Sequence, residues 1–81
     1  KALPALMRAA KLQRRAARAG VTVETTPAEL ETLAGQVAAG ENAEAALGEL
    51  LFKAAALARQ VGLDPEQALQ KANAAFTAAP H

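Results

Sequence analysis

The chain has 81 residues and a formal net charge of +1, with nine Lys and Arg against eight Asp and Glu. It has no cysteine, which excludes disulfides and thiolate metal sites, and its single histidine is the last residue, which leaves Ser-His-Asp catalysis without a base. One domain over residues 1–81 is expected. No apolar run suits a membrane span and no signal-peptide pattern appears, so the default expectation is a cytoplasmic protein, either whole or a fragment of a longer chain.

The charges are distributed unevenly along the chain. Six of the nine cations precede Gly20 with no acid among them, whereas all eight acids lie from Glu24 onward. The first segment therefore carries about +6 and the remainder about −5. Such asymmetry suits an anionic ligand, a nucleic acid, or the acidic face of a partner chain.

The first predicted helix covers residues 2–19. Pro4 is tolerated in its first turn, and Gly20 follows a basic last turn, where glycine commonly ends a helix. The next residues, 21–25, are extended by composition, but one short run cannot form a sheet. They are predicted to be a connector that crosses the helices.

Two more helices are predicted at residues 27–39 and 42–61. Thr26 and Glu29 have the spacing of a capping box, and Asn42 is expected to cap the following helix. Only two or three residues separate the two helices, so they are expected to form an antiparallel hairpin.

The helix at 42–61 has the clearest periodicity in the chain. Its apolar positions are Ala43, Leu47, Leu50, Leu51, Ala54, Leu57, Ala58 and Val61. Gly48 interrupts this stripe at a cost of roughly 1 kcal/mol relative to alanine. A glycine at this place suggests that another backbone or a ligand approaches closely.

The last helix is predicted at 65–78, with Asp64 as its cap. Its inward residues are predicted to be Leu69, Ala72 and Phe76. Phe52 and Phe76 lie on apolar stripes and are predicted to be core residues, which leaves no aromatic platform for nucleic-acid bases. The fold class is therefore all-α, and because alanine dominates the apolar content, a partner chain is expected to complete the small core.

Glu29 and Glu49, on facing helices, are the candidate metal ligands. Carboxylates so placed can hold Mg²⁺, and such ions can clamp a polyphosphate and activate a water molecule. An alternative to metal binding stays open for each residue. Glu29 would then be only the capping-box residue, and Glu49 only the i,i+4 partner of Lys53. Glu41 and Glu44 are interpreted as a polar helix start. No residue is assigned a catalytic role.

Residues 47–52, Leu-Gly-Glu-Leu-Leu-Phe, resemble the signature Glu-Leu-Gly-Asp-Leu-Leu-Phe of the MazG family of nucleoside triphosphate pyrophosphohydrolases. Residues 57–69 and 71–76 resemble the continuation of that family, and residues 11–20 resemble its first helix. The resemblance implies a four-helix bundle that dimerises or tetramerises. It also implies Mg²⁺-dependent cleavage of a nucleoside triphosphate, with attack by water, into a monophosphate and pyrophosphate.

The family holds its metals with Glu-x-x-Glu on the second helix and Glu-x-x-Asp on the third. By this resemblance Glu29 matches the first acid, but Thr32 stands at the second position. Ala46 stands where the third acid belongs, and Glu49 replaces the aspartate. Two of the four acids are therefore missing, and a third is longer by one methylene.

Three functional hypotheses remain open. The first is a MazG-like pyrophosphohydrolase of weak activity, with Mg²⁺ on Glu29 and Glu49 and with Lys71 and Asn73 on the nucleotide phosphates. The second, which we favour, is a non-catalytic MazG-like dimerisation or regulatory module, because hard cations need several oxygen ligands. The third and least favoured is nucleic-acid binding through the basic first helix.

Overall fold

The computed structural model describes residues 4–80, and within that range the chain is all-helical with no strand. The four helices are α1 (Ala5–Arg18), α2 (Pro27–Ala39), α3 (Ala43–Gln60) and α4 (Pro65–Ala78). The predicted bounds of α2 and α4 are confirmed, and α3 is one residue shorter at each end. Pro4 is extended and stands at the N-cap of α1, so that helix begins later than predicted. The predicted start at residues 2 and 3 lies outside the described residues.

The helix starts follow the predicted caps at two of three places. The Thr26 hydroxyl accepts a hydrogen bond from the Glu29 amide at 3.2 Å, and the Asp64 carboxylate accepts one from the Glu66 amide at 3.0 Å. Asn42 occupies the N-cap of α3 but makes no side-chain cap, which corrects the prediction. Its backbone is left-handed, with φ 49°, because the turn from α2 to α3 is short.

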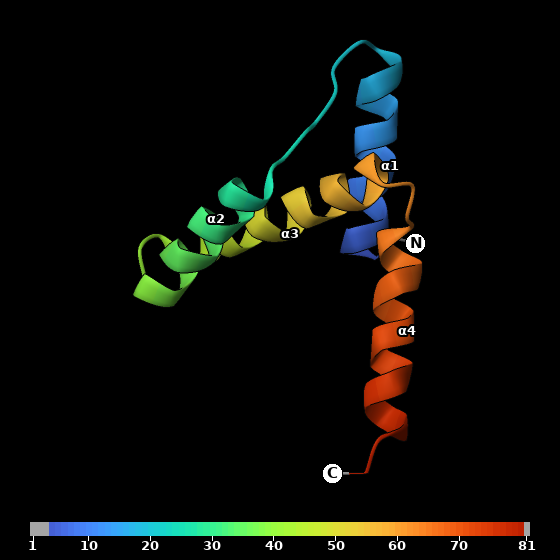
Figure 1. Ribbon diagram of the computed structural model, residues 1–81. Coiled ribbons are helices and arrows are strands. Elements are labelled where there is room, and N and C mark those ends of the chain that lie inside the picture. The colour runs from blue at the N-terminus through green and yellow to red at the C-terminus, as the bar shows by residue number, and fades with distance from the viewer. Residues whose placement is uncertain (1–3, 81) are drawn as a thin grey trace.

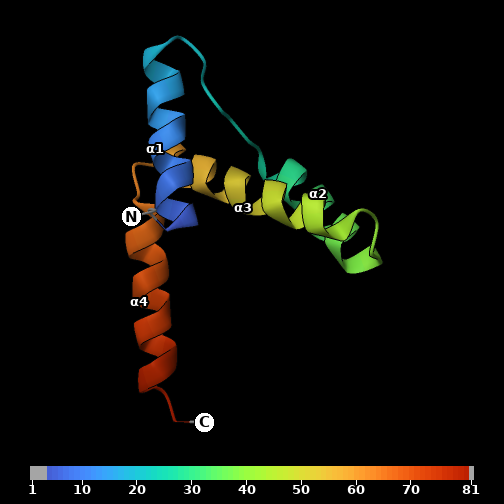
Figure 2. The same ribbon diagram turned by 180° about the vertical axis from the view of Figure 1, so that it is seen from behind.

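Helices α2 and α3 lie side by side and run antiparallel, as predicted (Figures 1 and 2). Gly40 ends α2 with φ 74°, a conformation that glycine adopts at little cost. Leu33 from α2 is buried, and so are Ala46, Ala55 and Ala56 from α3. Alanine side chains let helices approach closely, but each removes little apolar area from water.

Helix α1 crosses the C-terminal half of α3 (Figure 1). Ala10 and Gln13 are its buried residues, and Gln13 is only 1% exposed. The Gln13 Nε2 donates a hydrogen bond of 3.0 Å to the carbonyl oxygen of Phe52. The Gln13 Oε1 is buried and has no hydrogen-bond partner within residues 4–80. A glutamine thus joins α1 to α3 where an apolar side chain would be the usual choice.

Helix α4 starts beside α1 and α3 and then runs away from them (Figures 1 and 2). None of its residues is buried. Leu69 is 48% exposed and Phe76 is 69% exposed, and Ala72 is also exposed. The prediction that these three residues point into a core is therefore wrong for a single chain, because packing within residues 4–80 leaves all three exposed. Phe52, by contrast, is half-buried.

The outer part of the α3 stripe is also uncovered. Leu47, Leu51 and Val61 are exposed, although the periodicity predicts them to be buried. A β-carbon built on Gly48 would meet nothing within 4 Å, so no backbone approaches this glycine within the described chain. Across residues 4–80, the helices are all too short or too polar to cross a membrane.

Candidate functional site

Glu29 lies at the start of α2 and is held by two side chains. Its Oε2 forms an ion pair of 2.9 Å with the Nζ of Lys53, and its Oε1 accepts a hydrogen bond of 2.8 Å from the Thr25 hydroxyl. The hydrogen bond from Lys53, followed by the one from Thr25, lowers the pKa of the Glu29 carboxyl from its usual range. Glu29 is therefore ionised at neutral pH, and both of its oxygens are already engaged.

The partners of Glu29 also attach the connector to α3. The Gln60 Oε1 accepts a hydrogen bond of 2.8 Å from the Thr25 amide, and the Gln60 Nε2 donates one of 3.3 Å to the Thr25 carbonyl. The Lys53 Nζ reaches the carbonyl oxygen of Glu24 at 3.5 Å. Thr25 is buried as a result. These bonds fix the path of the connector across the hairpin, which gives Glu29 and Lys53 a structural role.

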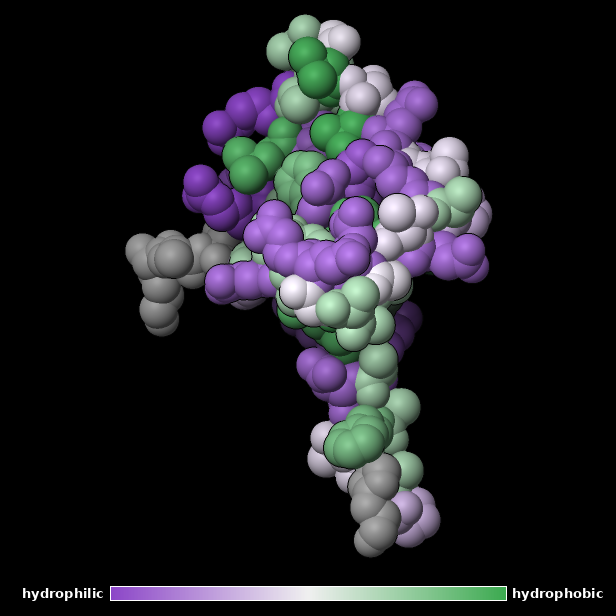
Figure 3. Space-filling model, turned by 90° about the vertical axis from the view of Figure 1, so that its left-hand side faces the viewer, coloured by the Kyte–Doolittle hydropathy of each residue, from purple (hydrophilic) through white to green (hydrophobic). Residues whose placement is uncertain are grey.

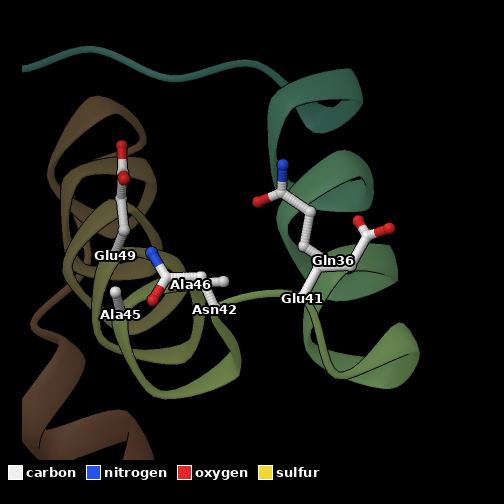
Figure 4. A pocket seen from close by; sticks show the side chains of 6 residues that line it. All are labelled: Gln36, Glu41, Asn42, Ala45, Ala46 and Glu49. Atoms are coloured by element: carbon white, nitrogen blue, oxygen red, sulfur yellow. The ribbon is translucent and has the colours of Figure 1, made fainter.

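Glu49 lies elsewhere on the hairpin, one turn before Lys53, and is exposed. It borders a hollow of about 300 Å³ between α2 and α3, shown in Figure 4. The hollow is lined by Gln36, Glu41, Asn42, Ala45, Ala46 and Glu49. The carboxylates of Glu41 and Glu49 lie on opposite sides of it (Figure 4). The two predicted metal ligands are thus in different settings, one ion-paired and one facing solvent.

The remaining positions of the implied metal site offer no carboxylate. The Thr32 hydroxyl donates a hydrogen bond of 3.0 Å to the carbonyl of Ala28 in its own helix. Ala46 contributes a methyl group to the wall of the hollow. Within residues 4–80, no three Asp, Glu or His side chains lie close enough to hold a metal ion. Mg²⁺ needs a near-octahedral set of oxygen ligands, and the described residues of one chain do not fit this requirement.

Lys71 and Asn73, the predicted phosphate contacts, are exposed on α4. At 3.6 residues per turn, two residues separated by one position point about 200° apart around a helix. The two side chains therefore do not converge on one phosphate group within a chain. Because α4 also leads away from the α2–α3 hairpin (Figure 1), their role as nucleotide ligands stays a prediction.

The basic residues of α1 form an exposed positive surface. Its members are Arg8, Lys11, Arg14, Arg15 and Arg18. In the described part of the chain none of them forms an ion pair, since the pair between Lys53 and Glu29 is the one found there. This surface is available to an anion or to an acidic partner.

The ion pair between Glu29 and Lys53 was missed from sequence, where Lys53 was paired with Glu49 four residues before it. In an antiparallel hairpin, however, the start of the first helix meets the later part of the second. Pairing residues across the hairpin would have placed Lys53 opposite Glu29. The local i,i+4 spacing favours Glu49 as the partner of Lys53. Only the register of the two helices decides between Glu49 and Glu29.

Comparison of the chain with protein-family models, with curated protein sequences and with solved structures gives no match. The functional assignment therefore rests on the residues and their geometry.

Proposed function

We propose that this chain is a MazG-like domain that acts as a homo-oligomerisation module and does not hydrolyse nucleotides. The observation that supports assembly most directly is the amount of exposed surface. The chain exposes 5930 Å², whereas a compact monomer of 8.3 kDa exposes about 4,600 Å². The radius of gyration is 14.1 Å, against about 12 Å for a compact domain of this length.

The excess of about 1,300 Å² is of the size that stable interfaces bury, since each partner of a standard complex buries about 800 Å² and obligate dimers bury more. Large apolar side chains contribute to this exposed area, with Leu51, Leu69 and Phe76 about half exposed or more. Figure 3 shows hydrophobic surface along the projecting helix α4. Large exposed apolar patches mark interaction sites. The alanine-rich composition already predicts that a second chain covers such a surface.

The state of the acidic residues supports the absence of catalysis. Glu29 is engaged by Lys53 and Thr25, and two of the implied ligand positions are Thr32 and Ala46. A metal ion bound at Glu29 would have to displace an ion pair of 2.9 Å. We therefore propose that the MazG-like fold serves assembly or regulation in this protein.

Two measurements test this proposal together. Light scattering after size exclusion, at protein concentrations from 1 to 100 micromolar, is expected to give the mass of a dimer or tetramer. Pyrophosphate release from a panel of ribo- and deoxyribonucleoside triphosphates is expected to be equal with Mg²⁺ and with EDTA. A monomer over the whole range would contradict the assembly function, and metal-dependent release would contradict the loss of catalysis.

A weak pyrophosphohydrolase is the second candidate, and one observation favours it. The hollow between α2 and α3 gathers oxygen donors from Gln36, Glu41, Asn42 and Glu49. An oligomer that brought further carboxylates to this hollow would complete a set of hard ligands. Metal-dependent release that disappears on Glu49→Gln and persists on Glu66→Gln would establish this reading, because Glu66 lies on α4, away from the hollow.

Restoring the missing acids tests the placement of the implied site. The variant Thr32→Glu, Ala46→Glu and Glu49→Asp, with Lys53→Met to release Glu29, is expected to bind Mg²⁺ measurably in calorimetry. The matched control carries Thr32→Gln, Ala46→Gln, Glu49→Asn and Lys53→Met, which have similar shapes without the charges. A folded acidic variant that binds no more Mg²⁺ than the control would contradict the resemblance at these positions.

A further inference from the structure

We infer that the apolar groove between α1, α3 and α4 receives helix α4 of a second copy of this chain, so that each α4 lies in the groove of the other. This inference rests on the proposed assembly function and adds to it the surface and the mode of contact.

The groove has a volume of about 400 Å³ and is open to solvent. Leu6 from α1 lines it, together with Leu51 and Phe52 from α3 and Leu69 from α4. No charged residue is among the residues that line it. A groove of this composition gains stability when an apolar helix excludes water from it.

Helix α4 has the matching surface. Leu69, Ala72 and Phe76 follow one another at spacings of three and four residues and thus share one side of the helix. All three are exposed, and the charged Lys71 lies on the opposite side. An amphipathic helix with no buried residue is stable mainly through tertiary packing, and its own chain supplies little of this packing.

Gly48 gives the groove room for an incoming helix. It lies on the wall of the groove, next to Leu51, and a β-carbon at this position would meet nothing within 4 Å. Without a side chain, a second backbone can approach α3 closely there. The glycine at position 48 of the continuous helix α3 thus has a reason in the assembly that it lacks in a single chain.

A second copy is the occupant that fits, because the chain carries both the groove and the helix that would fill it. A twofold axis would make the two contacts equivalent, with the two α4 helices antiparallel. At 1.5 Å per residue, the 14 residues of α4 span about 21 Å. Two such contacts would bury apolar surface of both chains, which is typical of an obligate dimer.

Crosslinking between two differently tagged chains tests this arrangement, and the chain has no native cysteine to interfere. One chain carries Gly48→Cys and the other Ala72→Cys, and they are mixed under mild oxidation. A disulfide needs α-carbons within about 7 Å, so a heterodimer of mixed tags is expected on a non-reducing gel. The matched control replaces Ala72→Cys by Lys71→Cys, on the other side of α4, and is expected to crosslink at least tenfold less.

A second measurement covers the case in which the cysteine variants misfold. Phe76→Glu is expected to raise the dimer Kd by about 30-fold or more, as for an interface hot spot, while Lys71→Glu leaves it unchanged. Circular dichroism should show equal helix content for both variants. A dimer whose Kd is unchanged by Phe76→Glu, and which forms no disulfide between the two tagged chains, would overturn the placement of α4 in the partner's groove. It would still agree with the assembly function. A chain that is monomeric throughout would overturn both.

Discussion

The α2–α3 hairpin and helix α4 are built from similar residues but have opposite surroundings. Leu33 in α2 is 8% exposed, whereas Leu69 in α4 is 48% exposed. The hairpin is tied to the connector through Glu29, Lys53 and Gln60, and α1 is tied to α3 through Gln13. Among the hydrogen bonds of residues 4–80, none joins a side chain of α4 to another helix. Periodicity alone therefore does not say whether a helix face is covered.

The difference teaches that the same helical periodicity can give a packed face in one part of the chain and an exposed face in another. Residues 4–60 close around a small alanine-rich core. Helix α4 runs away from them (Figure 1), and its Leu69 and Phe76 are exposed. Substitutions in residues 4–60 are expected to change the stability of the fold. Substitutions in α4 are expected to change local order and, under the proposed function, assembly.

The largest effect is expected from Gln13→Glu, which places a carboxylate in a buried site beside the carbonyl of Phe52. An uncompensated buried charge costs about 3–5 kcal/mol of unfolding free energy at pH 7. Burial raises the folded-state pKa of this new carboxyl above its unfolded value. The penalty is therefore absent below about pH 4.3 and grows as the pH rises toward the folded-state pKa.

Urea denaturation of Gln13→Glu at pH 4 and pH 7 measures this penalty. Gln13→Met, which is similar in size and uncharged, serves as the control at each pH. Equal stability of the two variants at pH 7 would show that the contact between α1 and α3 is open to water.

The next effect is expected from Gln60→Ala, which removes both hydrogen bonds to Thr25. The Thr25 amide would be left buried without a partner, which costs about 1–3 kcal/mol. Gln67→Ala, an exposed glutamine of α4, is expected to change the unfolding free energy by less than about 0.5 kcal/mol. Chemical denaturation of both variants measures the two changes in unfolding free energy. Equal changes would show that the hydrogen bonds between Gln60 and the connector do not stabilise the fold.

A smaller and more local effect is expected from Asp64→Ala, which removes the N-cap of α4. Loss of such a cap costs about 1 kcal/mol. In the Phe76→Glu background, which is chosen to remove the proposed contact of α4 with a second chain, hydrogen exchange should quicken in α4 alone. Thr26→Ala, the equivalent change in α2, should instead quicken exchange throughout α2 and α3. Faster exchange in α3 with Asp64→Ala would mean that α4 belongs to the cooperative core.

The smallest effect is expected from Lys53→Met, because Glu29 is partly exposed and solvent screens the pair. Lys53 lowers the pKa of Glu29, so the pair stabilises the fold above the ordinary glutamate pKa of about 4.3. That stabilisation is lost as the pH falls through the lowered value. Thermal melts should show a gap between the native chain and Lys53→Met that narrows from pH 7 to pH 3. A difference in melting temperature that stays constant with pH would show that the apolar stem of Lys53, and not its charge, stabilises the fold. Lys71→Met is the control for the loss of one positive charge.

The sequence by itself determined the class of fold and most helix bounds. Local signals sufficed for this, since Thr26 and Asp64 are cap residues and Gly40 permits a left-handed turn. The same reasoning found the antiparallel hairpin from the length of its loop. It was wrong at Asn42, whose backbone conformation is set by the turn and excludes the side-chain cap.

Only the tertiary structure decided which acids and which apolar faces have partners. Lys53 stands four residues from Glu49 in sequence, yet it pairs with Glu29 across the hairpin. Leu69 and Phe76 have the periodicity of core residues, yet they are 48% and 69% exposed. The physical reason is the same in both cases. Helical periodicity depends on residues within a few positions, whereas ion pairing and burial depend on the register and the packing of elements that are distant in sequence.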